Sequence, residues 1–221
     1  GFHTTRCINT RTQYKTQILR FERGSITTSN SSMTTTDDDR IPDFTARLGY
    51  AGGWGEASVA GVVRQLSVDN GVADGDSLGW GISGAGKILF GGKKQHDLRM
   101  MLTYGQGIGR YVGLNFSNDA VLNGSGDLDA IGVVAGFAAY RHVWAPGWRS
   151  SLIWSTQKVD NDTALTGTGV NRSAQSLHAN LIWSPVTAFD VGAEVMFADR
   201  KLESGLDGDM TRLILFAKYG F

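Results

Sequence analysis

The final segment of the chain, 212–221, alternates between apolar and polar side chains. Leu213 and Tyr219 fall on one face of an extended strand and Arg212 and Lys218 on the other, because successive side chains of a strand point to opposite sides. A chain that ends on an aromatic residue after such a strand is typical of bacterial outer-membrane barrels, in which the apolar face meets lipid. A single strand does not establish a fold, so the same pattern has to recur.

Alternation of this kind recurs along the chain at the spacing of a β-meander. The predicted strands are 43–53, 55–69, 76–90, 96–106, 127–144, 148–160, 172–184, 189–203 and 211–221, with a weaker tenth near 12–23. No segment has a 3.6-residue apolar period, and the longest apolar run is shorter than the roughly 18 residues of a membrane-spanning helix. Only helices and closed barrels satisfy their backbone groups in lipid. We therefore predict an all-β fold, a transmembrane antiparallel up-and-down β-barrel.

The connections between these strands alternate in length, as they do in outer-membrane barrels with short periplasmic turns and longer extracellular loops. The short links are 52–55, 91–95, 145–147 and 185–188. The other links are 24–42, 107–126, 161–171 and 204–210, which are mostly longer and polar, and 70–75, which is polar but short. Aromatic residues at or beside the short links are Trp54, Phe90, Trp144, Trp148, Trp183, Phe189 and Tyr219. This clustering predicts an interfacial aromatic girdle on the periplasmic side.

Composition narrows the classes of partner. The 221 residues include 21 basic and 21 acidic side chains, so no global field attracts nucleic acid. The single cysteine, Cys7, excludes an intramolecular disulfide and a thiolate zinc site. The sequence opens at Gly1 without a signal segment, which an exported barrel needs. We therefore expect a mature or truncated chain, and favour truncation.

Strand parity separates the charges. The basic residues assigned to the face away from lipid are Arg47, Arg64, Lys87, Arg99, Arg141, Arg149, Arg200, Arg212 and Lys218. Only three acidic residues, Glu56, Asp97 and Glu194, are assigned to the same face. A basic wall in a narrow aqueous pore concentrates anions, and arginine pairs with carboxylates through a bidentate fork. The alternative is an arginine ladder that a porin wall has regardless of its solute.

Arg110 lies in the long link 107–126. Such a loop either folds into the lumen, where Arg110 and Asn115 help to line a constriction, or remains a solvated surface loop. The predicted pore-lining residues are therefore Arg47, Arg64, Arg99, Arg110, Arg141, Arg149, Arg200, Arg212 and Lys218.

Three local patterns invite an enzymatic interpretation, and each lacks its required context. Residues 81–87 have the spacing of a phosphate-binding loop, but Ile88 follows and no helix does, so we interpret them as a glycine-rich strand. Residues 105–111 resemble part of a dinucleotide fingerprint without a βαβ unit. His142 and Ser150 are expected to be cross-strand neighbours on the lipid face, where interfacial packing is favoured over a lipase dyad. No metal spacing is evident among the histidines, and we expect no catalytic residue, cofactor or metal.

Several segments resemble the DcaP-like family of Gram-negative porins, which are associated with dicarboxylate uptake. They are 38–43, 109–115, 139–144, 191–194 and 217–221, and the resemblance covers about 38–221. It implies a sixteen-stranded barrel, assembled as a trimer, that passes small anions. The nine or ten strands predicted here correspond to the C-terminal part of such a barrel, and segment 1–37 remains poorly assigned.

Together these features predict an outer-membrane porin for passive diffusion of small anionic solutes, in particular (di)carboxylates, through an arginine-lined lumen. The expected partners are outer-membrane lipid, the solutes, two further copies of the chain and, through Phe221, the barrel-assembly machinery; no nucleic acid is expected. The alternatives are an outer-membrane barrel enzyme, either a protease or a phospholipase, and a non-conducting structural barrel. A barrel protease needs a histidine at the extracellular rim, which has Asp160, Asp162 and Asp207 but no histidine.

Overall fold

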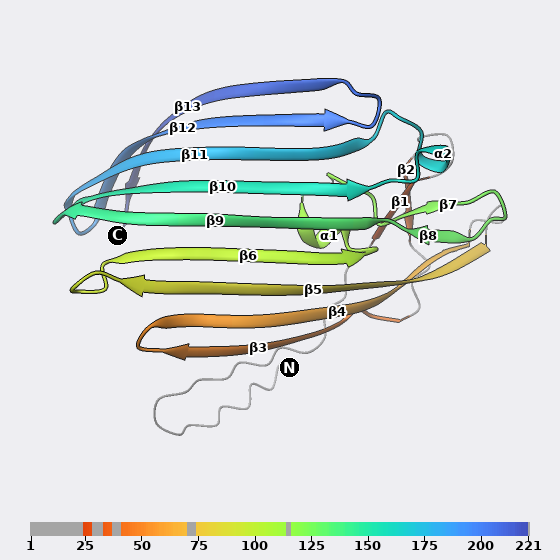
Figure 1. Ribbon diagram of the computed structural model, residues 1–221, viewed down its shortest axis with the longest axis horizontal. Coiled ribbons are helices and arrows are strands. Elements are labelled where there is room, and N and C mark those ends of the chain that lie inside the picture. Colours follow the sequence, from red (N-terminus) through yellow and green to blue (C-terminus); the bar gives the residue numbers. More distant parts are fainter. Residues whose placement is uncertain (1–23, 28–32, 37–40, 70–73, 114–115, 221) are drawn as a thin grey trace.

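The computed structural model describes residues 24–27, 33–36, 41–69, 74–113 and 116–220. Nine strands form one antiparallel sheet in which each strand pairs with the next one of the meander (Figure 1). These strands are β3 (Phe44–Gly52), β4 (Gly55–Asp69), β5 (Asp74–Phe90), β6 (His96–Gln106), β9 (Gly132–Ala145), β10 (Trp148–Asp160), β11 (Asn171–Val186), β12 (Phe189–Leu202) and β13 (Asp207–Tyr219). The edge strands β3 and β13 are not paired with each other within the described part of the chain, so the sheet is a curved wall with two open edges.

The predicted strands are confirmed with two corrections. The stretch 127–144 is not one strand, because the chain breaks at Ile131 between β8 (Leu128–Ala130) and β9. The link 204–210 is also shorter than predicted, since β13 already begins at Asp207, opposite Lys201. Polar residues can continue a ladder beyond an apolar band, because its hydrogen bonds need only the backbone. The weak tenth strand near 12–23 lies outside the described residues.

The alternation of short and longer connections is present in the structure. The turns β3–β4, β5–β6, β9–β10 and β11–β12 all lie at the left-hand end of the sheet in Figure 1, together with the C-terminal end of β13. Gly147, with φ of 80°, is in the left-handed region that the two-residue turn between β9 and β10 requires. The aromatic residues gather at this end, where Trp148 stacks on its cross-strand partner Trp183 with ring centroids 5.6 Å apart. Their predicted clustering beside the short turns is therefore confirmed.

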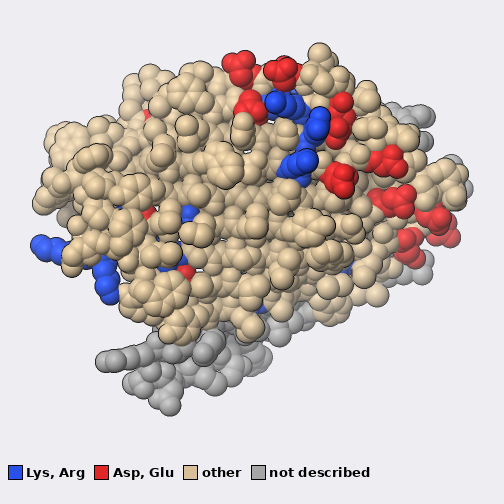
Figure 2. Space-filling view, viewed as in Figure 1, with Lys and Arg blue, Asp and Glu red and all other residues tan. Residues whose placement is uncertain are grey.

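The two faces of the sheet differ in polarity. One face exposes large apolar side chains on strands from β3 to β13, including Leu48, Leu102, Leu152, Leu181 and Leu215. Figure 2 shows that charged residues are sparse over the middle of this face and gather toward its ends. Isolated soluble proteins rarely expose so large an apolar patch, whereas a lipid-facing wall requires one. We call this the apolar face and the opposite one the basic face.

The stretch 107–131 connects β6 to β9, and we call it the inserted segment; its described residues, 107–113 and 116–131, pack against the basic face. The segment contains α1 (Gly109–Val112), β7 (Ala120–Leu122) and β8, and its two short strands join a second sheet of order β2-β1-β7-β8. In that sheet β1 (Gly24–Thr27) is parallel to β7 and antiparallel to β2 (Met33–Thr36). The described part of this loop therefore folds against the basic face of the sheet, and Asn115 lies outside the described residues.

Two small apolar cores hold the inserted segment in place. Ala120, Leu122 and Leu128 bury Leu66 and Val68 of β4. Ile108, Val121 and Ile131 form the second core with Val133 and Val159, and Leu165 of α2 (Thr163–Thr166) packs against it. Buried apolar area of this kind stabilises the position of a loop that polar contacts alone would leave mobile.

No helix in the described portion is both long enough and apolar enough to cross a membrane.

Candidate functional site

The pairing register places all nine predicted inward basic residues on the basic face. Directly opposite residues of neighbouring strands share a face, so Lys87 opposite Arg99 and Glu56 opposite Lys87 fix the parity of β4, β5 and β6. Asp97 opposite Arg141 extends the same face to β9. The remaining partners that share this face are Arg47 with Ala60, Arg64 with Gly79, Arg149 with Ile182, Arg200 with Ala174, Arg212 with Met196 and Lys218 with Asp190.

The basic face also carries two carboxylates that the sequence analysis did not assign to it. Asp190 accepts a hydrogen bond from Arg149 Nη2 at 2.9 Å and lies opposite Lys218. Asp43, just before β3, forms an ion pair with Arg64. Parity alone could have revealed Asp190, since it lies four residues before the inward Glu194 on the same strand. The face retains an excess of basic residues. The acidic groups that partly neutralise its positive charge are Asp43, Glu56, Asp97, Asp190 and Glu194.

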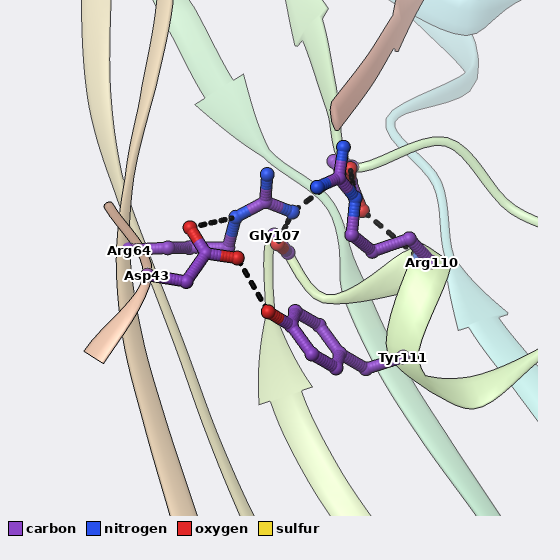
Figure 3. Close-up of polar contacts among 6 residues, drawn as sticks. Asp43, Arg64, Gly107, Arg110 and Tyr111 are labelled. Atoms are coloured by element: carbon purple, nitrogen blue, oxygen red, sulfur yellow. Dashed lines mark hydrogen bonds and ion pairs between the residues drawn. The ribbon is translucent and has the colours of Figure 1, made fainter. Parts of the chain in front are cut away.

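Arg64 does not line an open wall. Its side chain is 1% exposed because the inserted segment covers it, which corrects the prediction that Arg64 meets solute directly. Arg64 Nη1 lies 3.0 Å from Asp119 Oδ2 and 3.3 Å from the carbonyl oxygen of Gly107, and Nε lies 3.4 Å from Asp43 Oδ1 (Figure 3). Arg64 therefore joins the start of β3, the wall strand β4 and the inserted segment.

Tyr111 and Arg110 of α1 complete this cluster. The Tyr111 hydroxyl donates a hydrogen bond to Asp43 Oδ2, and the Arg64 guanidinium carbon lies 5.9 Å from the centroid of the Tyr111 ring. The backbone N–H of Arg110 donates to Asp119 Oδ1 at 3.1 Å, while Arg110 Nε lies 3.7 Å from Asp119 Oδ2. Burial, followed by the neighbouring Arg64 charge, lowers the pKa of Arg110 below its ordinary value, and Asp119 opposes that shift.

A second charge cluster lies toward the short turns. The buried Asp97 carboxylate is 2.7 Å from Arg99 Nε and 2.7 Å from Arg141 Nη2, and both arginines are partly exposed. One carboxylate thus holds two guanidinium groups at the wall surface and leaves a net positive charge there. Together with the Arg149–Asp190 pair, this arrangement fixes three of the predicted arginines through wall carboxylates.

The other predicted side chains are less constrained. Among the described residues, none of these has a carboxylate within ion-pair distance: Arg47, Lys87, Arg200, Arg212 and Lys218. Arg47 donates a hydrogen bond to Ser58 Oγ at 3.1 Å. Because Arg200 and Arg212 are exposed and keep their forks free of carboxylate partners, they are well suited to engage a passing carboxylate.

A hollow of about 640 Å³ lies on the basic face beside the inserted segment. Val112 and Phe116 of the segment line one side, while Phe137, Gln157 and Arg200 belong to the wall. The hollow is large enough for a small organic solute, and its lining combines apolar surface with Arg200 and the carboxylates of Asp199 and Asp209.

Glycines on the basic face of β5 and β6 form the seat of the inserted segment. A Cβ atom at Gly81 or at Gly105 would lie 2.8 Å from Ile108 Cδ1, and one at Gly79 would lie 2.7 Å from Arg64 Cγ. The glycine-rich stretch 81–87 is indeed part of a strand, β5, and no phosphate-binding loop forms there. Within that stretch Gly81 leaves room for Ile108 of the inserted segment, which is a role that the sequence pattern did not reveal.

The pair His142 and Ser150 is a cross-strand pair, as predicted, but it is not arranged for hydrolysis. Ser150 Oγ accepts a hydrogen bond from Trp144 Nε1 at 2.9 Å, and His142 Nδ1 is bonded to the Tyr140 hydroxyl at 2.8 Å. His142 also stacks on His96 at a centroid distance of 4.5 Å. These contacts support interfacial packing at the short-turn end. Within the described ranges, no group of three or more potential metal ligands is present.

Comparison with known proteins identifies the fold. No protein-family model and no curated protein matches the sequence. The structure is similar to that of the outer membrane channel DcaP of Acinetobacter baumannii, with a TM-score of 0.79 and 21% sequence identity. The superposition covers 97% of this chain and 60% of that channel, so this chain spans about three fifths of its length. The chain therefore has the fold of the DcaP outer membrane channel, which confirms the predicted antiparallel up-and-down architecture.

Proposed function

We propose that this chain forms the wall of an outer-membrane porin through which small anionic solutes diffuse passively. The observation that supports this proposal most is the division of one sheet into an apolar face and a basic face, with the inserted segment on the basic side. An apolar face is what lipid requires, and a charged face with a segment folded against it is what a narrowed aqueous passage requires. The likeness to an outer membrane channel is consistent with this role and with an outer-membrane location.

Anion preference follows from the charge of the passage. Arg47, Lys87, Arg200, Arg212 and Lys218 face the passage without carboxylate partners in the described part of the chain, while Arg99, Arg141 and Arg149 are held by wall carboxylates. Fixed positive charge beside low-dielectric walls raises the local concentration of anions. Passage also requires weak binding, because a solute held tightly at one site would block the pore.

Small carboxylic acids, dicarboxylates in particular, are the solute class that we propose. Two carboxylates on one molecule can contact two separated arginines in turn, and each guanidinium fork matches a carboxylate in geometry. Diffusion of this kind requires no chemical step, so no catalytic residue is assigned. We further propose that three copies assemble and that Phe221 directs assembly of the barrel.

The proposal is tested by solute entry into liposomes that contain the folded porin. Succinate, a neutral polyol of similar size and a diamine of similar size are compared by the rate of osmotic swelling. Faster entry of succinate than of the neutral and cationic solutes is the expected result. Equal rates for the three solutes would contradict anion preference, and no entry of any solute would contradict a porin. Hydrolysis of peptide or phospholipid by the same preparation would favour a barrel enzyme instead.

A further inference from the structure

The two ends of the inserted segment lie side by side where it leaves the sheet. We call this place, around Gly107 and Ile131, the neck. Gln106 of β6 pairs with Gly132 of β9, so the segment starts and finishes on adjacent strands. Within the neck, the N–H of Gly107 donates to the carbonyl of Ile131 at 3.0 Å, and the N–H of Ile131 donates to the carbonyl of Asp119 at 2.9 Å. Backbone bonds thus fix where the segment begins and ends but not how close its middle stays to the wall.

Asp119 connects the middle of the segment to the wall. Its side chain is fully buried, and its two carboxylate oxygens receive the Arg64 guanidinium from β4 and both the backbone N–H and Nε of Arg110 from α1. Val62, which packs against the second core of the segment, is the eighth residue of the fifteen-residue β4, so the segment reaches the middle of the wall strand. Asp119 therefore links this part of the segment to Arg64, two residues after Val62 on the same strand.

The charges in this cluster make the position of α1 depend on Asp119 as well as on the two apolar cores. Arg64 and Arg110 are both buried cations, and the Arg64 charge already opposes the protonated form of Arg110. With Asp119 neutralised, the Arg64 and Arg110 guanidinium groups would face each other without the carboxylate that now contacts both of them. Repulsion between like charges in a low-dielectric site is strong, and water cannot screen it while the segment stays down. Movement of α1 away from the wall would separate the two guanidinium groups and reduce this repulsion.

We propose that Asp119 is a positioning residue that holds the inserted segment against the basic face and thereby sets the width of the passage. This inference rests on the proposed porin function, because it states that the contact between Asp119 and Arg64 affects the conductance of the channel. Arg110, a predicted pore-lining residue, is on this account held in the cluster by Asp119, with its side chain only 10% exposed.

The test compares Asp119→Asn with Asp129→Asn in the assembled porin. Asp129 is an exposed residue of the same segment, so its substitution removes the same charge without touching the cluster. We expect Asp119→Asn to raise single-channel conductance, whereas Asp129→Asn, which removes the same negative charge, should leave the conductance nearly unchanged. Tyr111→Phe, which removes the hydrogen bond from the Tyr111 hydroxyl to Asp43 and keeps the ring, provides a milder variant and should raise conductance by a smaller amount.

Amide hydrogen exchange provides a readout that does not depend on conduction. Exchange of the Tyr111 and Gly113 amides of α1, which bond to the carbonyls of Ile108 and Gly109, should be roughly 100-fold faster in Asp119→Asn, as expected when one partner of a buried ion pair is removed. Unchanged exchange relative to Asp129→Asn would overturn the inference, and so would faster exchange with unchanged conductance. A wild-type protein that does not conduct would instead refute the proposed porin function, while the exchange measurement would still show whether Asp119 holds the segment.

Discussion

At the scale of single residues, the arginines of the basic face fall into two groups that parity could not separate. Arg99, Arg141 and Arg149 are engaged by wall carboxylates, and Arg64 is buried beneath the inserted segment. Arg200 and Arg212 have no carboxylate within ion-pair distance in the described ranges. A solute can therefore use the fork of the second group without displacing a partner.

Replacing Arg200 or Arg212 with lysine tests this distinction. Lysine keeps the charge but loses the bidentate fork, so block of chloride current by succinate should weaken several-fold while the reversal potential stays the same. Arg149→Lys is the matched control, because that fork is already occupied by Asp190 and Ser184. Equal weakening by all three substitutions would show that the division into two groups has no consequence for the solute.

The sequence was sufficient to predict which basic residues lie on the basic face. It was not sufficient to predict the burial of each side chain or its ion-pair partners. Alternation specifies a face because every second side chain of a strand points the same way. The burial of Arg64 depends on Asp119, which is 55 residues away, and on a segment with no strand period of its own. Contacts of this kind form only when distant parts of the chain pack together, so no local sequence pattern predicts them.

At the scale of elements, the inserted segment depends on glycines of the strand beneath it. Gly81 faces Ile108, whereas Gly84, three residues later on the opposite face of β5, has no atom within 4 Å of a built Cβ. The strands themselves were predictable because their alternation is regular. The break at Ile131 and the early start of β13 were not, since both occur where the sequence is polar or apolar on both faces.

Gly81→Val should destabilise the packing of the inserted segment, whereas Gly84→Val should not. The added side chain at Gly81 must displace Ile108, and overpacking of a formed core costs about 1–3 kcal/mol. Limited proteolysis of folded porin, followed at bonds within 107–131, measures the effect. Equal protection of that segment in the two variants would contradict the role assigned to the glycine seat.

At the scale of the whole molecule, the fold is one sheet with an apolar face and a basic face. Its apolar face exposes leucines on strands from β3 to β13, and its short-turn end collects the aromatic residues. A lysine on the apolar face near mid-membrane should cost about 2–4 kcal/mol of folding free energy, whereas one on the basic face should cost little.

Adjacent residues in the middle of β6 provide that comparison. Leu102 is 61% exposed on the apolar face and Met101 is 37% exposed on the basic face. Leu102→Lys should lower the denaturant midpoint for unfolding from lipid bilayers, and Met101→Lys should leave it nearly unchanged. The opposite ranking would mean that the two faces have been exchanged.

The central claim is that the basic face makes this protein an anion-preferring channel. The most direct test is the reversal potential of the assembled porin in a planar bilayer under a KCl gradient. The excess of basic side chains on the face that lines the passage predicts a reversal potential of the sign expected for chloride permeation. A reversal potential of the cation sign, or no current at all, would contradict the account.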